Sequence, residues 1–244
     1  MYILIFFLAH WFLSLFFQTF FLHRYASHRM FTTSKWFERT IYFLDYICLG
    51  SSFLNPRAYA LMHREHHAYS DTEKDPHSPH FFEDVFRMMW ATVLTYGDHL
   101  KRLKEPEARF AGNIPEWPLI DRIGSSIASR IVFGGLYTWY YIAFATEWWM
   151  YLLLPIHYLM GPIHGAIVNW CGHKYGYANF DNGDKSKNTT PFDFLMLGEL
   201  FQNNHHKRPN RANFGAKWFE IDPVYPVMKV MHWMHIIRLR KAYL

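Results

Sequence analysis

MYILIFFLAHWFLSLFFQTFFLHRYASHR, residues 1–29, is an apolar run that ends among histidines and arginines. Residues 1–22 are almost continuously apolar and match the roughly 20 residues that an α-helix needs to cross a bilayer. The start has no basic n-region and no small-residue cleavage site, which favours a retained membrane helix over a signal peptide. Cations cluster just after this run, so the positive-inside rule predicts that its C-terminal end faces the cytoplasm.

The composition also indicates a membrane protein. Of the 244 residues, 51% are hydrophobic, 20% are aromatic and only 18% are charged, whereas soluble domains carry roughly 25% charged residues. The net charge of +5 comes from basic residues beside the apolar runs and histidine clusters, and no nucleic-acid module is recognisable, so we expect no nucleic-acid partner. Cys48 and Cys171 lie in apolar segments and form no disulfide framework, as expected on a reducing side of the membrane.

Further apolar segments complete the predicted topology. Residues 131–145 and 148–168 resemble a helical hairpin whose second arm is kinked by Pro155 and Pro162. The segment 40–54 is apolar but short and carries Asp45, so it would dip into one leaflet or lie along the surface. We therefore predict an all-α integral membrane protein, with about three transmembrane helices, interfacial helices and a cytoplasmic cap in a single domain, residues 1–244. The membrane-spanning regions would be 1–22 and 131–168, and the mainly cytoplasmic ones 23–130 and 169–244.

Two polar regions lie outside the predicted spans. Residues 68–130 are polar and proline-containing, which is typical of a cap segment and not of a separate domain. The C-terminal stretch PVYPVMKVMHWMHIIRLRK (223–241) has Met, Trp and Ile at helical spacing and ends in cations. It predicts an amphipathic helix on the membrane surface, running to Arg238, Arg240 and Lys241.

Histidines cluster in three separate stretches that this topology brings to one face of the membrane. In the second stretch, His63, His66 and His67 stand at i, i+3 and i+4, which places them on one face of a helix. His23 and His28 can converge where the first helix ends. Side-chain amides stand one helical turn before histidines at two further places. The candidate set is His23, His28, His63, His66, His67, His173, His205 and His206, with Asn169 and Gln202.

Eight imidazoles are too many for one ion, because zinc normally takes four ligands, so two metals fit better. Imidazole suits iron, zinc, copper and nickel, and ligand type alone does not choose among them. Isolated histidines near a membrane boundary are interpreted differently, either as single polar residues without a ligand role or as part of the amphipathic helix. The first kind is His10, His99, His157 and His164, and the second is His232 and His235.

Four motifs together resemble the integral-membrane fatty acid desaturases, and most closely the acyl-CoA (stearoyl-CoA type) branch. They are HRYASHR (23–29), HREHHAYSDTEKDPH (63–77), NWCGH (169–173) and GELFQNNHH (198–206). The resemblance implies a di-iron centre that uses O2 to remove two hydrogens from a methylene pair of an acyl chain. It also implies that the eight histidines ligate two irons, that Asn169 holds a metal-bound water, and that Gln202 lies in the shell of one iron, directly or through water.

The sequence departs from the family pattern in four ways. It has one span before the first histidine box where the family usually has two. Nothing resembles a fused haem domain, so we expect an external electron donor such as ferredoxin, rubredoxin or a cytochrome with its reductase. In YALMH (59–63), Tyr59 and Leu61 replace the Trp and the Arg that meets the carrier, so acyl-CoA, acyl carrier protein and phospholipid all remain open. Gln202 replaces a histidine of this branch, although the front-end desaturases carry Gln there.

Two alternatives stay open at this stage. The same site could hydroxylate a fatty acid, an alkane or a carotenoid. The chain could instead be a non-catalytic metal-binding membrane protein or a metal transporter. A transporter should carry its polar residues at mid-membrane, whereas these histidines cluster at one interface.

Overall fold

The first helix is longer than the sequence predicted. The computed structural model describes residues 1–240, and its α1 (Tyr2–Phe17) continues directly into the π-helix η1 (Gln18–Ser27). Together they form a helix of 26 residues that is long and apolar enough to cross a membrane. The helix therefore continues five residues beyond the predicted span, 1–22.

The second apolar region is a bent hairpin. It comprises α7 (Ile127–Phe144), the 3-10 helix η3 (Trp148–Leu153), α8 (Leu154–Tyr158) and α9 (Met160–Lys174), and α8 contacts α7 on its return. The chain bends by 77° between α8 and α9, between the two prolines predicted to kink it. Pro162 has no N–H to donate to the carbonyl of Tyr158, and α8 ends at Tyr158.

The prediction of about three membrane-spanning helices is not supported in full. Over residues 1–240, the helix Tyr2–Ser27 meets the length and hydropathy of a span by itself. The bent pair Trp148–Tyr158 and Met160–Lys174 adds a second only if both parts are one span. The 18-residue α7 does not reach the hydropathy of a span because polar residues interrupt its apolar ones.

The segment between the apolar regions carries more helix than its polar composition suggested. The helix α2 (Lys35–Leu49) and the 3-10 helix η2 (Gly50–Ser52) are followed by α3 (Pro56–Tyr69). Asn55 caps the N-terminus of α3, because its side-chain oxygen accepts a hydrogen bond from the Ala58 N–H at 3.0 Å. Such caps contribute about 1 kcal/mol. The segment 68–130, predicted only as a cap, also contains α4 (Val85–Leu100), which packs against α3 and α9. The short α5 (Ala108–Ala111) and α6 (Pro118–Gly124) follow.

The predicted C-terminal helix is partly wrong. After α10 (Gln202–Lys207), α11 (Val224–Trp233) ends five residues before Arg238, and His235 then adopts a positive φ of 60°. The chain continues as β2 (Ile237–Leu239), which pairs antiparallel with β1 (Phe31–Thr33). Arg238 is exposed between two buried neighbours, as the two-residue period of a strand requires. Arg240 follows this strand, and Lys241 lies outside the described residues.

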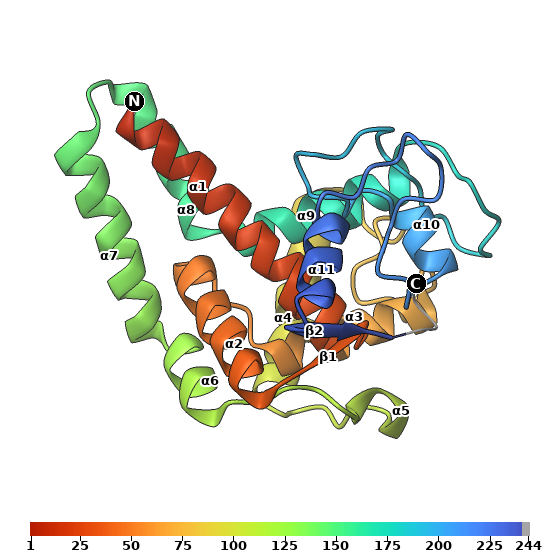
Figure 1. The fold of residues 1–244 in the computed structure, drawn as a ribbon. Coiled ribbons are helices and arrows are strands. Elements are labelled where there is room, and N and C mark those ends of the chain that lie inside the picture. The colour runs from red at the N-terminus through yellow and green to blue at the C-terminus, as the bar shows by residue number, and fades with distance from the viewer. Residues whose placement is uncertain (241–244) are drawn as a thin grey trace.

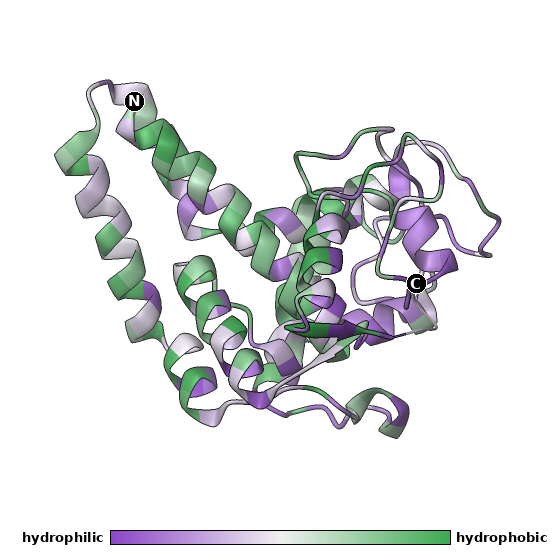
Figure 2. Ribbon diagram, in the orientation of Figure 1, coloured by the Kyte–Doolittle hydropathy of each residue, from purple (hydrophilic) through white to green (hydrophobic). Residues whose placement is uncertain are grey.

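The helices sort by polarity into two regions. Figure 1 shows α1, α2 and α7 on the side of the N-terminus, and α3, α9, α10 and the long loops toward the C-terminus. Figure 2 shows α1 as predominantly hydrophobic, whereas α10 and its surroundings are hydrophilic. The first helix therefore links an apolar region to the region that carries the histidines.

Candidate metal centre

Eight histidines gather into two neighbouring groups that could each hold a metal ion. Within each group the ring nitrogens lie within 4.8 Å of one another. Four helices contribute, namely η1, α3, α9 and α10, so the site exists only when segments from both halves of the chain come together. The structure places every predicted histidine ligand in one of the groups. The first group is His23, His28, His63, His67 and His205, and the second is His66, His173 and His206.

The π-helix brings the first two ligands together. Residues five apart on an α-helix point roughly 140° away from each other, because each residue turns by about 100°. In η1 the backbone bonds run from residue i to i+5, and the His28 N–H donates to the His23 carbonyl at 3.2 Å. The two rings consequently approach to 5.1 Å between centroids. Their convergence was predicted from sequence, but its backbone geometry was not.

The helix α3 serves both groups. His63 and His67, one turn apart, contribute to the first group, while His66 turns toward His173 and His206 in the second. The ring centroids of His66 lie 4.9 Å from His173 and 5.0 Å from His206. A single helix face at i, i+3 and i+4 is thus divided between two positions, which allows one helix to bridge two ions.

Carboxylates that the sequence analysis missed hold four of these rings. A carboxylate only accepts, so each of these imidazoles carries its proton on Nδ1 and keeps Nε2 free for a metal. Asp71 and Asp75 lie inside the quoted motif HREHHAYSDTEKDPH, and Glu199 lies three residues before Gln202. Their closeness to the histidine motifs is the sequence feature that could have identified them. The pairs are His66–Asp75 at 2.9 and 3.0 Å, His173–Asp71 at 2.9 Å, His206–Asp184 at 2.7 Å, and His23–Glu199 at 2.7 and 2.9 Å.

The free ring nitrogens fit a metal. In the second group the Nε2 atoms of His66, His173 and His206 are all buried without a hydrogen-bond partner. Leaving such groups unpaired is costly, and a cation would satisfy all three at once. In the first group, His205 Nε2 lies 2.9 Å from both His23 Nε2 and His67 Nε2. One proton cannot serve both contacts, whereas a metal ion accepts all three lone pairs.

Burial keeps the imidazoles of His63, His205 and His206 neutral, while Asp71 and Asp75 stay ionised. Burial holds the pKa of His63 and of His205 well below the usual value, and lowers that of His206 to about 4. Neutral imidazole is the form that binds metals. Burial opposes ionisation of Asp71 and Asp75, but their bonds to His173 and His66 outweigh it and hold both pKa values well below the usual range.

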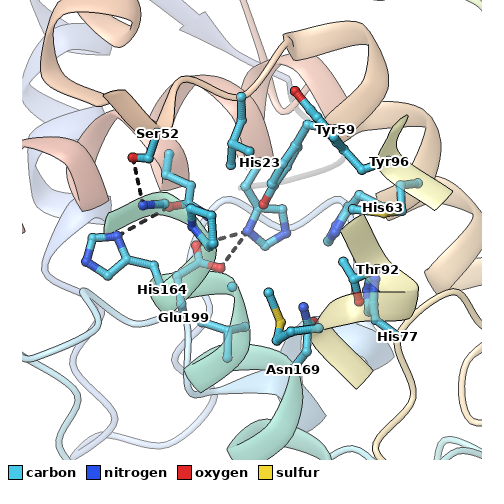
Figure 3. Close-up of a pocket in the computed structure, with 18 of the residues that line it drawn as sticks. His23, Ser52, Tyr59, His63, His77, Thr92, Tyr96, His164, Asn169 and Glu199 are labelled. Atoms are coloured by element: carbon cyan, nitrogen blue, oxygen red, sulfur yellow. Dashed lines mark hydrogen bonds and ion pairs between the residues drawn. The ribbon is translucent and has the colours of Figure 1, made fainter. Parts of the chain in front are cut away.

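A cavity of about 300 Å³ adjoins the two groups. Figure 3 shows His23, His63 and Asn169 around it, with Glu199 bonded to His23. Other parts of its wall are apolar, and an apolar wall fits an alkyl chain. The apolar lining includes Leu15, Leu54, Met62, Met89, Val93 and Val168.

Both predicted amides lie on the cavity wall. Asn169 stands one turn before His173 on α9, and Gln202 opens α10 one turn before His205. The Gln202 side chain is 3% exposed, and its amide nitrogen donates to the Glu199 carbonyl at 2.8 Å. Gly172 makes room for it, because a Cβ there would lie 2.5 Å from Gln202 Cγ.

The isolated histidines lie outside both groups. His10 and His157 face each other with their Nδ1 atoms 2.6 Å apart, His99 contacts Glu65, and His164 contacts Gln18. His232 belongs to α11 as predicted, but His235 lies beyond its end. A histidine that the sequence analysis passed over, His77, forms a further possible ligand triad with His66 and Asp75.

The chain resembles known proteins over nearly its full length. The profile of the family "Fatty acid desaturase" matches residues 1–236. An sn-1 stearoyl-lipid 9-desaturase of Anabaena variabilis is 27% identical, covering 86% of this chain and 72% of that protein. An acyl-CoA 5-desaturase of Anemone leveillei is 28% identical, covering 87% and 63%. A hex-5-enoyl-[acyl-carrier protein] acetylenase of Moorena producens is 28% identical, covering 88% and 69%.

Proposed function

Because the chain belongs to the fatty acid desaturase family, we propose that it is a membrane-bound di-iron enzyme that introduces a double bond into an acyl chain. O2 would be the co-substrate, and the electrons would come from an external donor. The observation that carries the proposal is the paired arrangement of eight buried or half-buried imidazoles beside an apolar-walled cavity. Iron bound there would supply the oxygen chemistry that breaks an unactivated C–H bond, which zinc lacks.

The protein residues would orient the ligands and exclude water. The carboxylates of Glu199, Asp71, Asp75 and Asp184 each accept a hydrogen bond from the Nδ1–H of one histidine, which would orient the Nε2 atom of that histidine toward a metal. The apolar part of the cavity wall would hold the methylene chain beside the metals and keep bulk water away. Asn169 and Gln202, on the same wall, would bind a metal or its water through their amide groups.

The carrier of the acyl chain is left open by the residues near the second histidine box. Leu61 is fully buried and cannot contact a soluble carrier. Tyr59 stacks on His63 with ring centroids 5.9 Å apart and lines the cavity, so it would contact the acyl chain and not its carrier. The three relatives described above are named for a lipid, a CoA ester and an acyl carrier protein.

We further propose that the chain crosses the membrane more than once and keeps the histidines on the cytoplasmic face. The long helix Tyr2–Ser27 supports insertion. The bend between α8 and α9 supports a second segment that enters and returns. Basic residues after the first helix, Arg29, Lys35 and Arg39 among them, support the orientation.

Fatty acid profiling of a host that expresses the protein tests the activity directly. We expect a new double bond in the host's fatty acids, absent from cells with an equal membrane level of His66→Ala. That variant removes one ligand and leaves the apolar helices intact. A hydroxylated product would replace desaturation with hydroxylation. Protein purified with zinc alone, without O2 consumption, would favour the non-catalytic metal-binding protein.

A further inference from the structure

Helix α4 carries an apolar side that the rest of the described chain leaves uncovered. Four large apolar residues are exposed along it, at i, i+4, i+7 and i+8, namely Phe86 (82%), Trp90 (67%), Val93 (49%) and Leu94 (54%). This spacing places them on one side of a helix. The charged side chains of α4 are Arg87 and Asp98. A contiguous exposed apolar surface of this kind marks contact with a membrane or with another protein.

Another side of α4 forms part of the cavity wall. The α4 residues that line the cavity stand at i, i+3, i+4 and i+7, and they are Met89, Thr92, Val93 and Tyr96. Figure 3 shows Thr92 and Tyr96 at the cavity. Val93 belongs to both sides, because it lines the cavity and is also half exposed. The uncovered apolar side of α4 and the cavity wall therefore meet along one edge of the helix.

The wall that α4 and α9 share is the least enclosed part of the cavity. The lining residues on α1, η1 and α10 are all buried, namely Leu15, Gln18, Thr19, His23 and Gln202. By contrast, Met89 of α4 and Pro162, Gly165 and Val168 of the adjacent α9 line the cavity and are only partly buried. A Cβ on Gly165 would meet no atom within 4 Å, so there is open space at this wall.

The charges at the cavity and on α4 do not suit a soluble, anionic carrier. CoA carries phosphate groups, which proteins bind with Arg and Lys. Among the described residues that line the cavity, the one with a permanent positive charge is Arg130. Its guanidinium donates to the backbone carbonyls of Ser51, at 2.8 Å, and Phe53, at 3.2 Å. On α4, Arg87 pairs with Glu83. Both guanidinium groups thus already have partners within the protein.

We propose that the acyl chain enters the cavity laterally from the bilayer, between α4 and α9, and that its carrier is a membrane lipid. This inference rests on the proposed function, because it requires that the cavity holds an acyl chain beside the metals. The apolar side of α4 lies in the membrane interface, where tryptophans such as Trp90 are enriched. A methylene chain then passes from bilayer to cavity along apolar surface and avoids the free-energy cost of exposure to water.

Photo-crosslinking tests this entry without turnover. The iron-loaded full-length protein in phosphatidylcholine vesicles, without an electron donor, receives one of three probes that share a diazirine-bearing acyl chain. The probes are a phosphatidylcholine, an acyl-CoA and an acyl carrier protein thioester. After illumination, mass spectrometry measures labelling of Leu15 on α1 and Met62 on α3, which are buried residues of the cavity wall.

Two variants place bulk in the proposed entrance, Gly165→Leu and Val93→Trp. Gly135→Leu is the matched control, because Gly135 lies on α7 outside the cavity wall, and a Cβ there also meets no atom within 4 Å. Thermal unfolding verifies that each variant folds. If neither entrance variant folds, the comparison of the three probes on the wild-type protein still decides the carrier.

We expect the lipid probe to label Leu15 and Met62 in wild type and in Gly135→Leu. In Gly165→Leu and Val93→Trp this labelling should fall about tenfold or more, equivalent to about 1.4 kcal/mol, because the added side chain must be displaced before the acyl chain can pass. The CoA and carrier-protein probes should label both residues less than the lipid probe does.

Three other results have different meanings. Equal labelling by the lipid probe in wild type and in both folded entrance variants overturns lateral entry. Stronger labelling by the CoA or carrier-protein probe than by the lipid probe overturns the membrane-lipid carrier and leaves the proposed function intact. A cavity that none of the three probes labels overturns the proposed function itself, because it then holds no acyl chain.

Discussion

Replacing Glu199 with Gln should weaken one metal site and spare the other. Glu199 is 6% exposed, and its two carboxylate oxygens lie 2.9 and 2.7 Å from Nδ1 of His23, which is itself 1% exposed. Thr19 donates to the same carboxylate. A glutamine keeps the shape but offers a single acceptor oxygen to these two donors and turns an NH2 group toward one of them.

The size of the effect follows from these contacts. Removing a partner that orients a ligating histidine typically lowers metal affinity 10–100-fold, which is about 1.4–2.8 kcal/mol. Losing a hydrogen bond to a charged group costs about 1.5–3 kcal/mol of folding stability. Because His23 belongs to the five-histidine group, we expect the loss in that metal only.

The assay is a chelator competition with Fe(II), read as iron per chain, alongside thermal unfolding of the metal-free protein. Glu116→Gln is the matched control, since Glu116 pairs with Arg102 on the surface and contacts no histidine. Folded Glu199→Gln protein that retains both irons with wild-type affinity would refute the role of this carboxylate.

Four further predictions concern other parts of the molecule. Gln202→Ala should cut desaturation strongly while Gln202→His keeps some, and wild-type turnover in the alanine variant would make Gln202 a bystander. Gly172→Ala should displace Gln202, costing about 1–3 kcal/mol of stability by overpacking and lowering activity with it; unchanged unfolding and turnover would show that the contact is slack. Burial without a hydrogen-bond partner raises the pKa of Asp45 well above the 3.8 of the unfolded chain, so its contribution to stability is full below pH 3.8 and is lost as pH rises toward the folded pKa. As pH rises above 3.8, the free energy of unfolding of Asp45→Asn should therefore fall less than that of wild type. Equal pH dependence of the two unfolding free energies would contradict this. Cysteines introduced at exposed positions of residues 63–80 and 198–215 should be labelled from the same, cytoplasmic side, and labelling from opposite faces would end the single-site interpretation.

Local sequence patterns were sufficient for the first helix and for the candidate ligands. An unbroken apolar run needs no distant partner to be recognised as a long helix, and the structure has it from Tyr2 to Ser27. The spacing of His63, His66 and His67 depends on helix geometry alone. The choice of eight histidines rested on such short-range rules and on topology, and the two groups contain these eight.

Features that depend on distant contacts were missed. The strand Ile237–Leu239 exists because Phe31–Thr33, more than 200 residues earlier, offers it a partner. A local helical pattern cannot show that partner, so the predicted helix ran too far. The polar composition of 68–130 likewise concealed α4, whose packing against α3 and α9 closes one side of the cavity.

The division of the histidines between two groups was decided by tertiary structure. Sequence spacing placed His63, His66 and His67 on one face, but only the approach of α9 and α10 assigns His66 to one group and its neighbours to the other. The supporting acids are equally non-local, since Glu199 reaches His23 from 176 residues away. The local sequence is enough to identify the candidate ligand residues. Which histidines share a group, and which carboxylate holds each ring, depends on how distant segments pack in the folded chain.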